Sequence, residues 1–407
     1  MRAILFRIFT LILSVTFFSA TALADSVIPI PSSAVKPIII NPAAPNLDVK
    51  SYILMDADSG KILAEKDADL RLPPASLTKL MTMYVISDAL KNGTIRQDDK
   101  VRISEKAWKT GGSRMFVKVN DEVPVQELLK GIVIASGNDA AVAMAEHLAG
   151  TESAFADLMN THAQQLGMKN SHFVDSNGLP NPDHYATARD LAILARAIIQ
   201  QFPDDYKLYS EKWFAWNNIR QPNRNRLLWH FPEADGLKTG HTSEAGFCLV
   251  GSAKKDSTRL ISVVMGAKSD QARTEDSIRL LTYGFRFYET HKIYSASTAL
   301  TTVRVWKGKD KEIDLGLADD LFVTLPAGQY KNIQAKLTVS DPLKAPIKKD
   351  QPCGTLTITL NDQVLATQPL IALSNNARGN LWRSVSDSIN FSVAKFFTHS
   401  TDKVNSG

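Results

Sequence analysis

Cysteine is scarce in this chain, which has only Cys248 and Cys353 among its 407 residues. The two lie far apart, outside any Cys-x-x-Cys pair and without a neighbouring histidine cluster. The pattern therefore excludes a disulfide-rich scaffold and a zinc-binding module. Cys248 falls within an apolar, strand-like run, so we expect it to be a buried free thiol. The sequence predicts no metal site and no cofactor.

A strong charge of one sign is also lacking, because the formal net charge is only +5. Arg2 and Arg7 contribute to it from a segment that we expect to be removed. The remaining excess is too small to favour nucleic acid as a partner. With 44% hydrophobic residues, 22% charged residues, 21 Gly and 18 Pro, the composition excludes disordered, collagen-like and coiled-coil proteins. The length allows two or three globular domains.

Hydrophobic runs long enough to span a bilayer, about 20 residues, are absent. The apolar run Ile8–Phe18 follows Arg2 and Arg7 and precedes Ala22-Leu23-Ala24. This order of basic, apolar and small residues predicts a secretory signal peptide over 1–24, with a permanent anchor as the alternative. We expect the mature chain to begin at Asp25, outside the cytoplasm, with an N-terminal leader over 25–48.

Residues 375–407 are predicted to form a linker and an amphipathic helix. Apolar side chains recur at helical spacing on one face, at Trp382, Val385, Ile389, Val393 and Phe396. The segment is too polar to span a membrane but suits the lipid interface, so we expect it to act as a membrane anchor. A terminal helix docked on its own domain is the alternative.

Between these ends, residues 49–293 read as a mixed domain that we expect to be catalytic. Short apolar runs separated by turn residues predict strands over 51–57, 60–65, 247–253 and 260–266. Longer periodic segments predict helices over 76–90, 124–134, 139–149, 153–166, 187–201 and 272–289.

Residues 294–374 differ, because short β-like runs replace the helical patterns. Examples are 301–306, 321–325, 333–339 and 355–360, separated by Gly, Pro, Asn or Asp. This texture predicts a small β-sandwich domain. Since it offers no histidine, paired acid or Gly-rich loop suited to chemistry, we expect a spacer or docking module.

Three short motifs carry the chemistry. A serine three residues before a lysine on a helix places hydroxyl and amine on one face, and Ser76-Leu77-Thr78-Lys79 opens an apolar helix directly after two prolines. Ser136-Gly137-Asn138 follows on a turn between two helices, and Lys238-Thr239-Gly240 lies just before a β-hairpin. Each motif also occurs by chance elsewhere, so order and context decide. A second Lys-Thr-Gly at Lys109 precedes Ser136 within loop sequence, and we discard it.

These motifs in this order are typical of β-lactamases and penicillin-binding proteins, although Gly137 stands where the usual middle residue is Asp. The surrounding runs resemble low-molecular-mass penicillin-binding proteins, specifically D-alanyl-D-alanine carboxypeptidases. The similar stretches are Pro74–Lys79, Ser136–Ala140, Asn177–Leu179, Asn223–Asn225, Asp235–Thr242 and Tyr283–Arg286.

The resemblance covers nearly the whole mature chain and implies its fold. That fold is α+β, with a penicillin-binding or serine β-lactamase-like transpeptidase domain, an antiparallel sheet flanked by helices. A small β-sandwich domain and a C-terminal amphipathic helix follow. The implied partners are peptidoglycan stem peptides ending in D-Ala-D-Ala, β-lactams as inhibitors and the membrane surface. The implied location is the periplasmic face of the inner membrane.

The motif residues suit serine acylation. A free hydroxyl is a weak nucleophile and needs a base, so we expect Ser76 to attack and a neutral Lys79 to take its proton. Burial and a nearby cation must lower the pKa of Lys79, and Lys238 could supply that charge. Ser136 would relay the proton to the departing D-alanine.

Substrate binding is expected from a second set of residues. Asn138 would bind the substrate amide, and the terminal carboxylate would find partners in Lys238, Thr239 and Arg224. Gly240 completes the third motif. The resemblance implies an oxyanion hole formed by the backbone N–H groups of Ser76 and His241, so His241 is expected to matter for its backbone rather than its ring.

Several alternatives stay open from sequence. A D,D-endopeptidase that splits peptidoglycan cross-links would use the same motifs. A serine β-lactamase is another reading, but Glu146 and Glu152 lack the setting expected of a deacylating glutamate. Asp175 and His172 could serve a serine-protease triad, although Ser-Lys chemistry needs neither. A cell-wall scaffold with an inactive site is the non-enzymatic alternative.

Overall fold

The computed structural model describes residues 43–340 and 342–380. The predicted signal peptide, most of the leader and the predicted amphipathic helix therefore lie outside the described residues. Among the helices that are described, none is long and apolar enough to cross a membrane.

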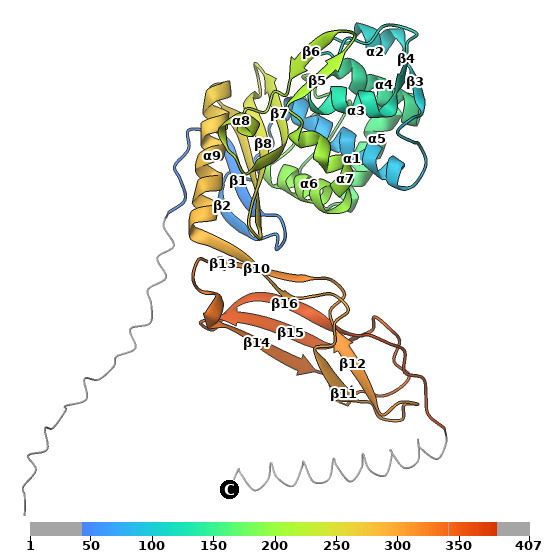
Figure 1. The fold of residues 1–407 in the computed structure, drawn as a ribbon, viewed down its shortest axis with the longest axis vertical. Helices are drawn as coiled ribbons and strands as arrows, with labels where there is room; N and C mark the ends of the chain where they lie inside the picture. Colours follow the sequence, from blue (N-terminus) through green and yellow to red (C-terminus); the bar gives the residue numbers. More distant parts are fainter. Residues whose placement is uncertain (1–42, 341, 381–407) are drawn as a thin grey trace, which may run out of the picture. The chain divides into compact units, whose positions relative to one another are not determined.

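The first body is built on a five-stranded antiparallel sheet in the order β2-β1-β9-β8-β7, with helices on both faces (Figure 1). Its strands are β1 (Ser51–Asp56), β2 (Ile62–Lys66), β7 (Ala234–Thr242), β8 (Gly246–Lys255) and β9 (Thr258–Ala267). Two small two-stranded sheets accompany it, β3 (Lys100–Arg102) with β4 (Glu122–Pro124) and β5 (Trp213–Trp216) with β6 (Ile219–Pro222).

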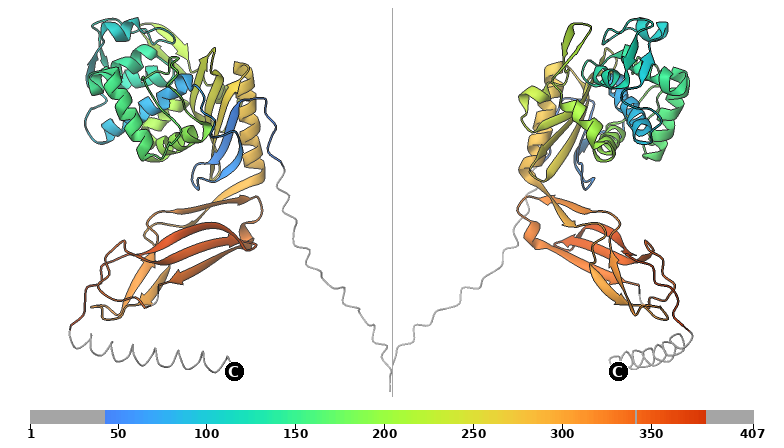
Figure 2. Two further views of the ribbon diagram at one scale, coloured as in Figure 1. Left: turned by 180° about the vertical axis from the view of Figure 1, so that it is seen from behind. Right: turned by 45° about the vertical axis from the view of Figure 1, so that its right-hand side comes forward.

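Strand β1 shows why both faces of the sheet are covered. All six of its residues are buried, and successive side chains of a strand point to opposite faces. Ile53 and Met55 join one hydrophobic cluster, whereas Tyr52 and Leu54 join another. Helix α9 (Asp270–Phe287) packs on the second face together with the short α8 (Leu227–His230), and α6 (Ala188–Gln201) with the helical lobe lies on the first (Figure 2).

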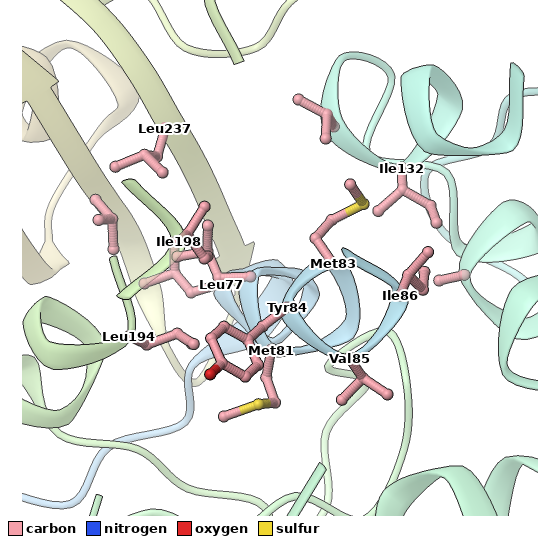
Figure 3. Close-up of a cluster of buried hydrophobic side chains, with 14 of the residues drawn as sticks. Leu77, Met81, Met83, Tyr84, Val85, Ile86, Ile132, Leu194, Ile198 and Leu237 are labelled. Atoms are coloured by element: carbon pink, nitrogen blue, oxygen red, sulfur yellow. The ribbon is translucent and has the colours of Figure 1, made fainter. Parts of the chain in front are cut away.

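Helix α1 (Lys79–Lys91) runs through the centre of the helical lobe and is buried continuously from Lys79 to Ser87. Its apolar side chains project in several directions, toward Ile132 on one side and Leu194 on another (Figure 3). The helices and short 3₁₀ turns that complete the lobe are η1 (Ala75–Thr78), α2 (Glu105–Lys109), α3 (Val125–Val133), α4 (Asn138–Ala149), α5 (Glu152–Gln165), α7 (Pro203–Tyr206) and η2 (Lys207–Ser210).

The second body is β-rich, as predicted. A five-stranded antiparallel sheet in the order β11-β12-β16-β15-β14 and the ribbon β10-β13 share one hydrophobic core. The elements are β10 (Tyr288–Tyr294), β11 (Thr301–Arg304), β12 (Glu312–Gly316), β13 (Leu321–Pro326), η3 (Tyr330–Asn332), β14 (Ile333–Val339), β15 (Pro352–Leu360) and β16 (Gln363–Ala372). Strand β10 pairs with β13, although most of it falls in the range 49–293 predicted for the catalytic domain.

The predicted strands and helices fall on elements of the structure, although the last two residues of the predicted helix 272–289 belong to β10. As predicted, Lys238-Thr239-Gly240 lies just before the hairpin of β8 and β9, and the structure adds that these residues belong to β7, a strand at the sheet edge. Both cysteines are free and buried, as expected for Cys248.

Candidate active site

The nucleophile motif lies on the turn that leads into α1. After Pro73 and Pro74 the backbone of Ala75 takes the left-handed conformation, with φ 49°, and η1 begins there. This conformation is strained for a residue other than glycine, and such backbone strain is common at functional sites. The turn places Ser76 half-buried beside Lys79, whose Nζ lies 3.0 Å from Ser76 Oγ.

Ser136 lies between α3 and α4, on the predicted turn. Its backbone is also left-handed, with φ 59°, and its side chain is 2% exposed. Lys238 Nζ donates to Ser136 Oγ at 2.9 Å. The second and third motifs therefore meet through a serine–lysine contact like that of the first.

Strand β7 passes directly over the nucleophile turn. A Cβ atom on Gly240 would lie 2.8 Å from the carbonyl oxygen of Pro74 and 3.2 Å from the backbone nitrogen of Leu77. Only glycine allows this approach, which explains the glycine of the Lys-Thr-Gly motif. The strand edge and the nucleophile turn thus form one surface.

A cavity of about 240 Å³ opens where the three motifs meet. Six predicted site residues line it, namely Ser76, Ser136, Arg224, Thr239, Gly240 and His241. Lys79 and Lys238 are 1% and 2% exposed and reach the cavity through the hydroxyls of the two serines. Four lining residues were missed from sequence: Ser113, Phe247, Asp270 and Arg273.

Burial governs the charge of the two site lysines. Desolvation lowers the pKa of Lys79 to about 7, against the opposing effect of Asp175 and Asp139, and Arg224 lowers it further. The cation that depresses this pKa is thus Arg224, where the sequence suggested Lys238. Burial lowers the pKa of Lys238 as well, with the charges of Lys79, Arg224 and Arg273 acting in the same direction. Lys79 is therefore suited to accept a proton near neutral pH.

Asn138 connects the site to a loop that sequence reasoning set aside. Its Oδ1 accepts from Lys79 Nζ at 2.6 Å, and its Nδ2 donates to the carbonyl of Gly111 at 2.7 Å. Gly111 belongs to the discarded Lys109 motif, so the loop after that motif borders the site. The predicted contact between Asn138 and a substrate amide stays a prediction.

The buried carboxylate of Asp139 fixes this loop. Its two oxygens accept the backbone N–H groups of Met115, Phe116 and Val117 at 2.9–3.3 Å. Ser113 is thereby held at the cavity wall. An Asp following Ser-x-Asn carries no sequence signal for this role, because its partners lie more than twenty residues upstream.

The serine-protease alternative does not fit the geometry. The amine of Lys79, and no histidine, is hydrogen-bonded to Ser76 Oγ. Asp175 Oδ2 lies 3.7 Å from His184 Nδ1, while His172 Nδ1 contacts the backbone carbonyl of Asp183. The contacts of Ser76 therefore fit a serine–lysine arrangement and not a serine-protease triad.

Comparison with known families agrees with this geometry. Residues 39–269 match the family model of D-alanyl-D-alanine carboxypeptidase, peptidase family S11. The chain belongs to this family. Residues 288–378 match the model of the C-terminal domain of penicillin-binding protein 5, which accounts for the β-rich body.

Relatives and solved structures of the carboxypeptidase family align along most of the chain. It is 45% identical over 362 residues to D-alanyl-D-alanine carboxypeptidase DacC of Escherichia coli, covering 87% of this chain and 90% of the relative. Penicillin-binding protein 5 of Haemophilus influenzae superposes with a TM-score of 0.79 at 41% identity, covering 83% and 100%. Ampicillin-bound penicillin-binding protein D2 of Listeria monocytogenes gives a TM-score of 0.55 at 29% identity, covering 59% and 100%.

Two further side chains shape the cavity of this carboxypeptidase-family site. Arg273, on α9, donates to the carbonyls of Gly240 and Cys248 at 2.8 and 3.2 Å, which ties α9 to β7 and β8. The exposed ring of His241 stacks on Phe247 with centroids 4.0 Å apart. The sequence predicted the helix that carries Arg273, but helical periodicity could not show that its first turn reaches the cavity.

Proposed function

We propose that this enzyme removes the terminal D-alanine from peptidoglycan stem peptides through an ester on Ser76. The observation that carries the proposal is the contact between Ser76 Oγ and the buried Lys79 amine, whose pKa is lowered to about 7. A substantial fraction of that amine is neutral at neutral pH, as a general base requires. Family membership supplies the reaction class.

In the acylation step, Ser76 Oγ attacks the carbonyl carbon of the penultimate D-alanine while its proton passes to Lys79 Nζ. The backbone N–H groups of Ser76 and His241 would stabilise the resulting oxyanion. The bond to the terminal D-alanine then breaks, and Ser136 relays a proton to the departing amine. Water hydrolyses the ester and releases the shortened peptide.

The cavity wall suits the terminal carboxylate of such a substrate. Thr239 offers a hydroxyl, and Arg224, exposed on the cavity side, offers a guanidinium. Lys238 donates a hydrogen bond to Ser136 at the same site. Because a guanidinium, a hydroxyl and Ser76 line one cavity, the site favours a substrate that ends in a carboxylate close to the scissile bond.

Labelled penicillin tests the nucleophile, because a β-lactam carbonyl reacts as the acyl-D-Ala-D-Ala carbonyl does. Mass spectrometry of the digested protein should place the adduct on Ser76. Ser113→Ala is a matched control, since Ser113 lines the same cavity and should leave labelling in place. An adduct on Ser113 or Ser136 would refute the assignment.

Digestion of purified peptidoglycan tests the reaction. Free D-alanine with cross-links intact is the expected product pattern. Split cross-links without D-alanine would identify an endopeptidase instead.

We also propose that the enzyme works at the periplasmic face of the inner membrane. The signal-peptide pattern over 1–24 and the amphipathic pattern over 380–398 support this location. A substrate attached to the cell wall is accessible there, outside the cytoplasm.

A further inference from the structure

Three oxygen atoms lie close to the amine of Lys79, and they differ in their hydrogen-bonding ability. Its Nζ lies 3.0 Å from Ser76 Oγ, 2.6 Å from Asn138 Oδ1 and 2.8 Å from the backbone oxygen of Asn177. The last two oxygens can only accept. The orientation of the Asn138 amide is fixed, because its Nδ2 donates to Gly111.

A neutral amine has two N–H groups and one lone pair. If the oxygens of Asn138 and Asn177 take the two N–H groups, the lone pair faces the hydroxyl of Ser76 and can receive its proton. The Asn177 carbonyl is therefore as important for the direction of the lone pair as the Asn138 side chain. Because it is a backbone group, the residues that hold the turn 174–178 determine its position.

Asp175 fixes this turn from within. Its Oδ1 accepts the backbone N–H groups of Asn177 at 2.9 Å and Gly178 at 2.6 Å. The turn then docks on the nucleophile segment so closely that a Cβ atom on Gly178 would lie 1.9 Å from the oxygen of Ala75. Thr82 on α1 donates to the carbonyl of Ser176 at 2.6 Å.

His184 connects the turn to the nucleophile motif itself. The ring is 3% exposed, its Nε2 lies 2.8 Å from Thr78 Oγ1, and its Nδ1 lies 3.7 Å from Asp175 Oδ2. The backbone N–H of Val174 donates to Nδ1 at 3.4 Å, so Nε2 carries the ring proton and donates to Thr78. Thr78 stands immediately before Lys79.

We propose that Asp175 and His184 are positioning residues for the general base, holding the turn 174–178 so that the Asn177 carbonyl directs the Lys79 lone pair at Ser76. This inference rests on the proposed function, in which Lys79 is the base. Neither residue touches the cavity: both act through the turn and through Thr78.

The charge of Asp175 adds a second effect that can be measured separately. The titratable groups whose charges act on Lys79, or would act on it if they were charged, are Asp175, Asp139, Arg224, Lys238 and His184. Among them Asp175 acts most strongly to raise the pKa of Lys79, against the lowering by burial. Burial lowers the pKa of His184, which keeps its ring neutral near pH 7. Loss of the Asp175 charge should therefore lower the pKa of Lys79, whereas replacing the neutral His184 should leave it in place.

The test measures the rate constant for acylation by labelled penicillin as a function of pH in the full-length protein. In Asp175→Asn the rise of the rate with pH should move to lower pH, and the plateau should stay within a few-fold, because an amide oxygen still accepts the turn N–H groups. In Asp175→Ala the same shift should accompany a plateau about 10- to 100-fold lower, as a displaced base predicts. Asp183→Asn is the matched control, since this exposed carboxylate on the same loop undergoes the same charge change and should alter neither quantity.

His184 is tested by a pair of variants at temperatures well below their melting points. His184→Ala should lower the plateau about 10-fold or more without moving the pH rise. His184→Gln keeps a donor for Thr78 and should restore much of the rate. An Asp175→Ala variant with the plateau and pH profile of the parent, or His184→Ala and His184→Gln acylating equally, would overturn the proposal. If the parent protein itself forms no ester at Ser76, the proposed function fails instead.

Discussion

At the scale of single residues, the decisive property of the site is a lysine that water does not reach. An exposed lysine has a pKa near 10.4 and is almost fully protonated at neutral pH. Lys79 is 1% exposed, and its burial outweighs the two carboxylates that favour its charged form. The amine becomes a base because its surroundings disfavour the ammonium form.

The pH dependence of acylation follows from this burial. With the pKa of Lys79 lowered to about 7, the neutral amine is scarce at low pH and predominates above that value. The acylation rate constant should therefore rise about tenfold per pH unit up to about pH 7 and then level off. Stopped-flow measurements with a fluorescent penicillin across this range provide the check. A rate that is independent of pH through this region would contradict the assignment of Lys79 as the base.

Removing the base while keeping the charge is a second test at this scale. The guanidinium of Lys79→Arg cannot be deprotonated in a protein, so acylation should fall by about 10²- to 10⁴-fold, the usual contribution of a general base. Since the buried site has little room for the larger group, Lys79→Met serves as the companion variant of similar length. Both should bury their side chains and retain the parent circular dichroism spectrum. Near-normal acylation in either folded variant would show that another group accepts the proton.

At the scale of elements, three chain segments come together at the site, and their secondary structure was predictable from sequence to different degrees. The turn before α1 and the turn before α4 follow from Pro and Gly punctuation around apolar periodicity. The residues of β7 lack the alternation of β-branched side chains that is typical of a strand. They form a strand because they pair with β8, where His241 lies opposite Phe247. Sequence therefore placed Lys238 correctly before the β8–β9 hairpin but did not predict the strand that carries it.

The missed residues share a physical reason. Ser113 and Arg273 are held at the cavity by contacts between distant segments: the Ser113 carbonyl accepts the backbone N–H of Asn138, and Arg273 donates to the carbonyl of Gly240. Asp175 and His184 likewise act on Lys79 through a folded turn. A local sequence pattern predicts the secondary structure of a segment. Which distant segment packs against it depends on the tertiary structure. The motif residues could be found from sequence because the reaction itself requires those residue types at those spacings.

The docking of the turn 174–178 on η1 gives a prediction at this scale. Gly178 has φ +83°, and an added Cβ would lie 1.9 Å from the Ala75 oxygen. Gly178→Ala should therefore lower both the melting temperature and the acylation rate. Gly167→Ala is the matched control, because Gly167 has φ +79° with nothing within 4 Å of the added atom. It should cost only the backbone strain, about 1–2 kcal/mol, and leave acylation in place. Equal losses in the two variants, by thermal unfolding and penicillin labelling, would show that the close contact is unimportant.

At the scale of the whole molecule, the proposed chemistry and the proposed membrane attachment belong to different parts of the chain. The residues of the proposed reaction fall between Ser76 and Arg273, and the cavity they form has no contribution from the β-rich body. That body matches a domain model of penicillin-binding protein 5, and its core is built from apolar side chains. Activity on small substrates should therefore be separable from attachment to the membrane.

The C-terminal segment carries the last prediction. Trp382, Val385, Ile389, Val393 and Phe396 would bury apolar surface at a lipid interface, each Å² being worth roughly 25 cal/mol. Deleting residues 380–407 should release the mature protein from vesicles and leave turnover of short soluble peptides unchanged. Since only Arg383 and Lys395 are basic among residues 380–398, high salt should release little of the full-length protein.

Two point variants of the C-terminal segment distinguish membrane insertion of its apolar face from a general effect of added negative charge on vesicle binding. Ile389→Asp places a carboxylate on the predicted apolar face and should weaken flotation with vesicles in a density gradient. Ser384→Asp adds the same charge on the polar face, where an inserted helix keeps it in water, so its flotation should match that of the parent protein. If the parent protein does not float, the segment is no membrane anchor. If both variants lose binding equally, the apolar face is not what holds the enzyme on the vesicle.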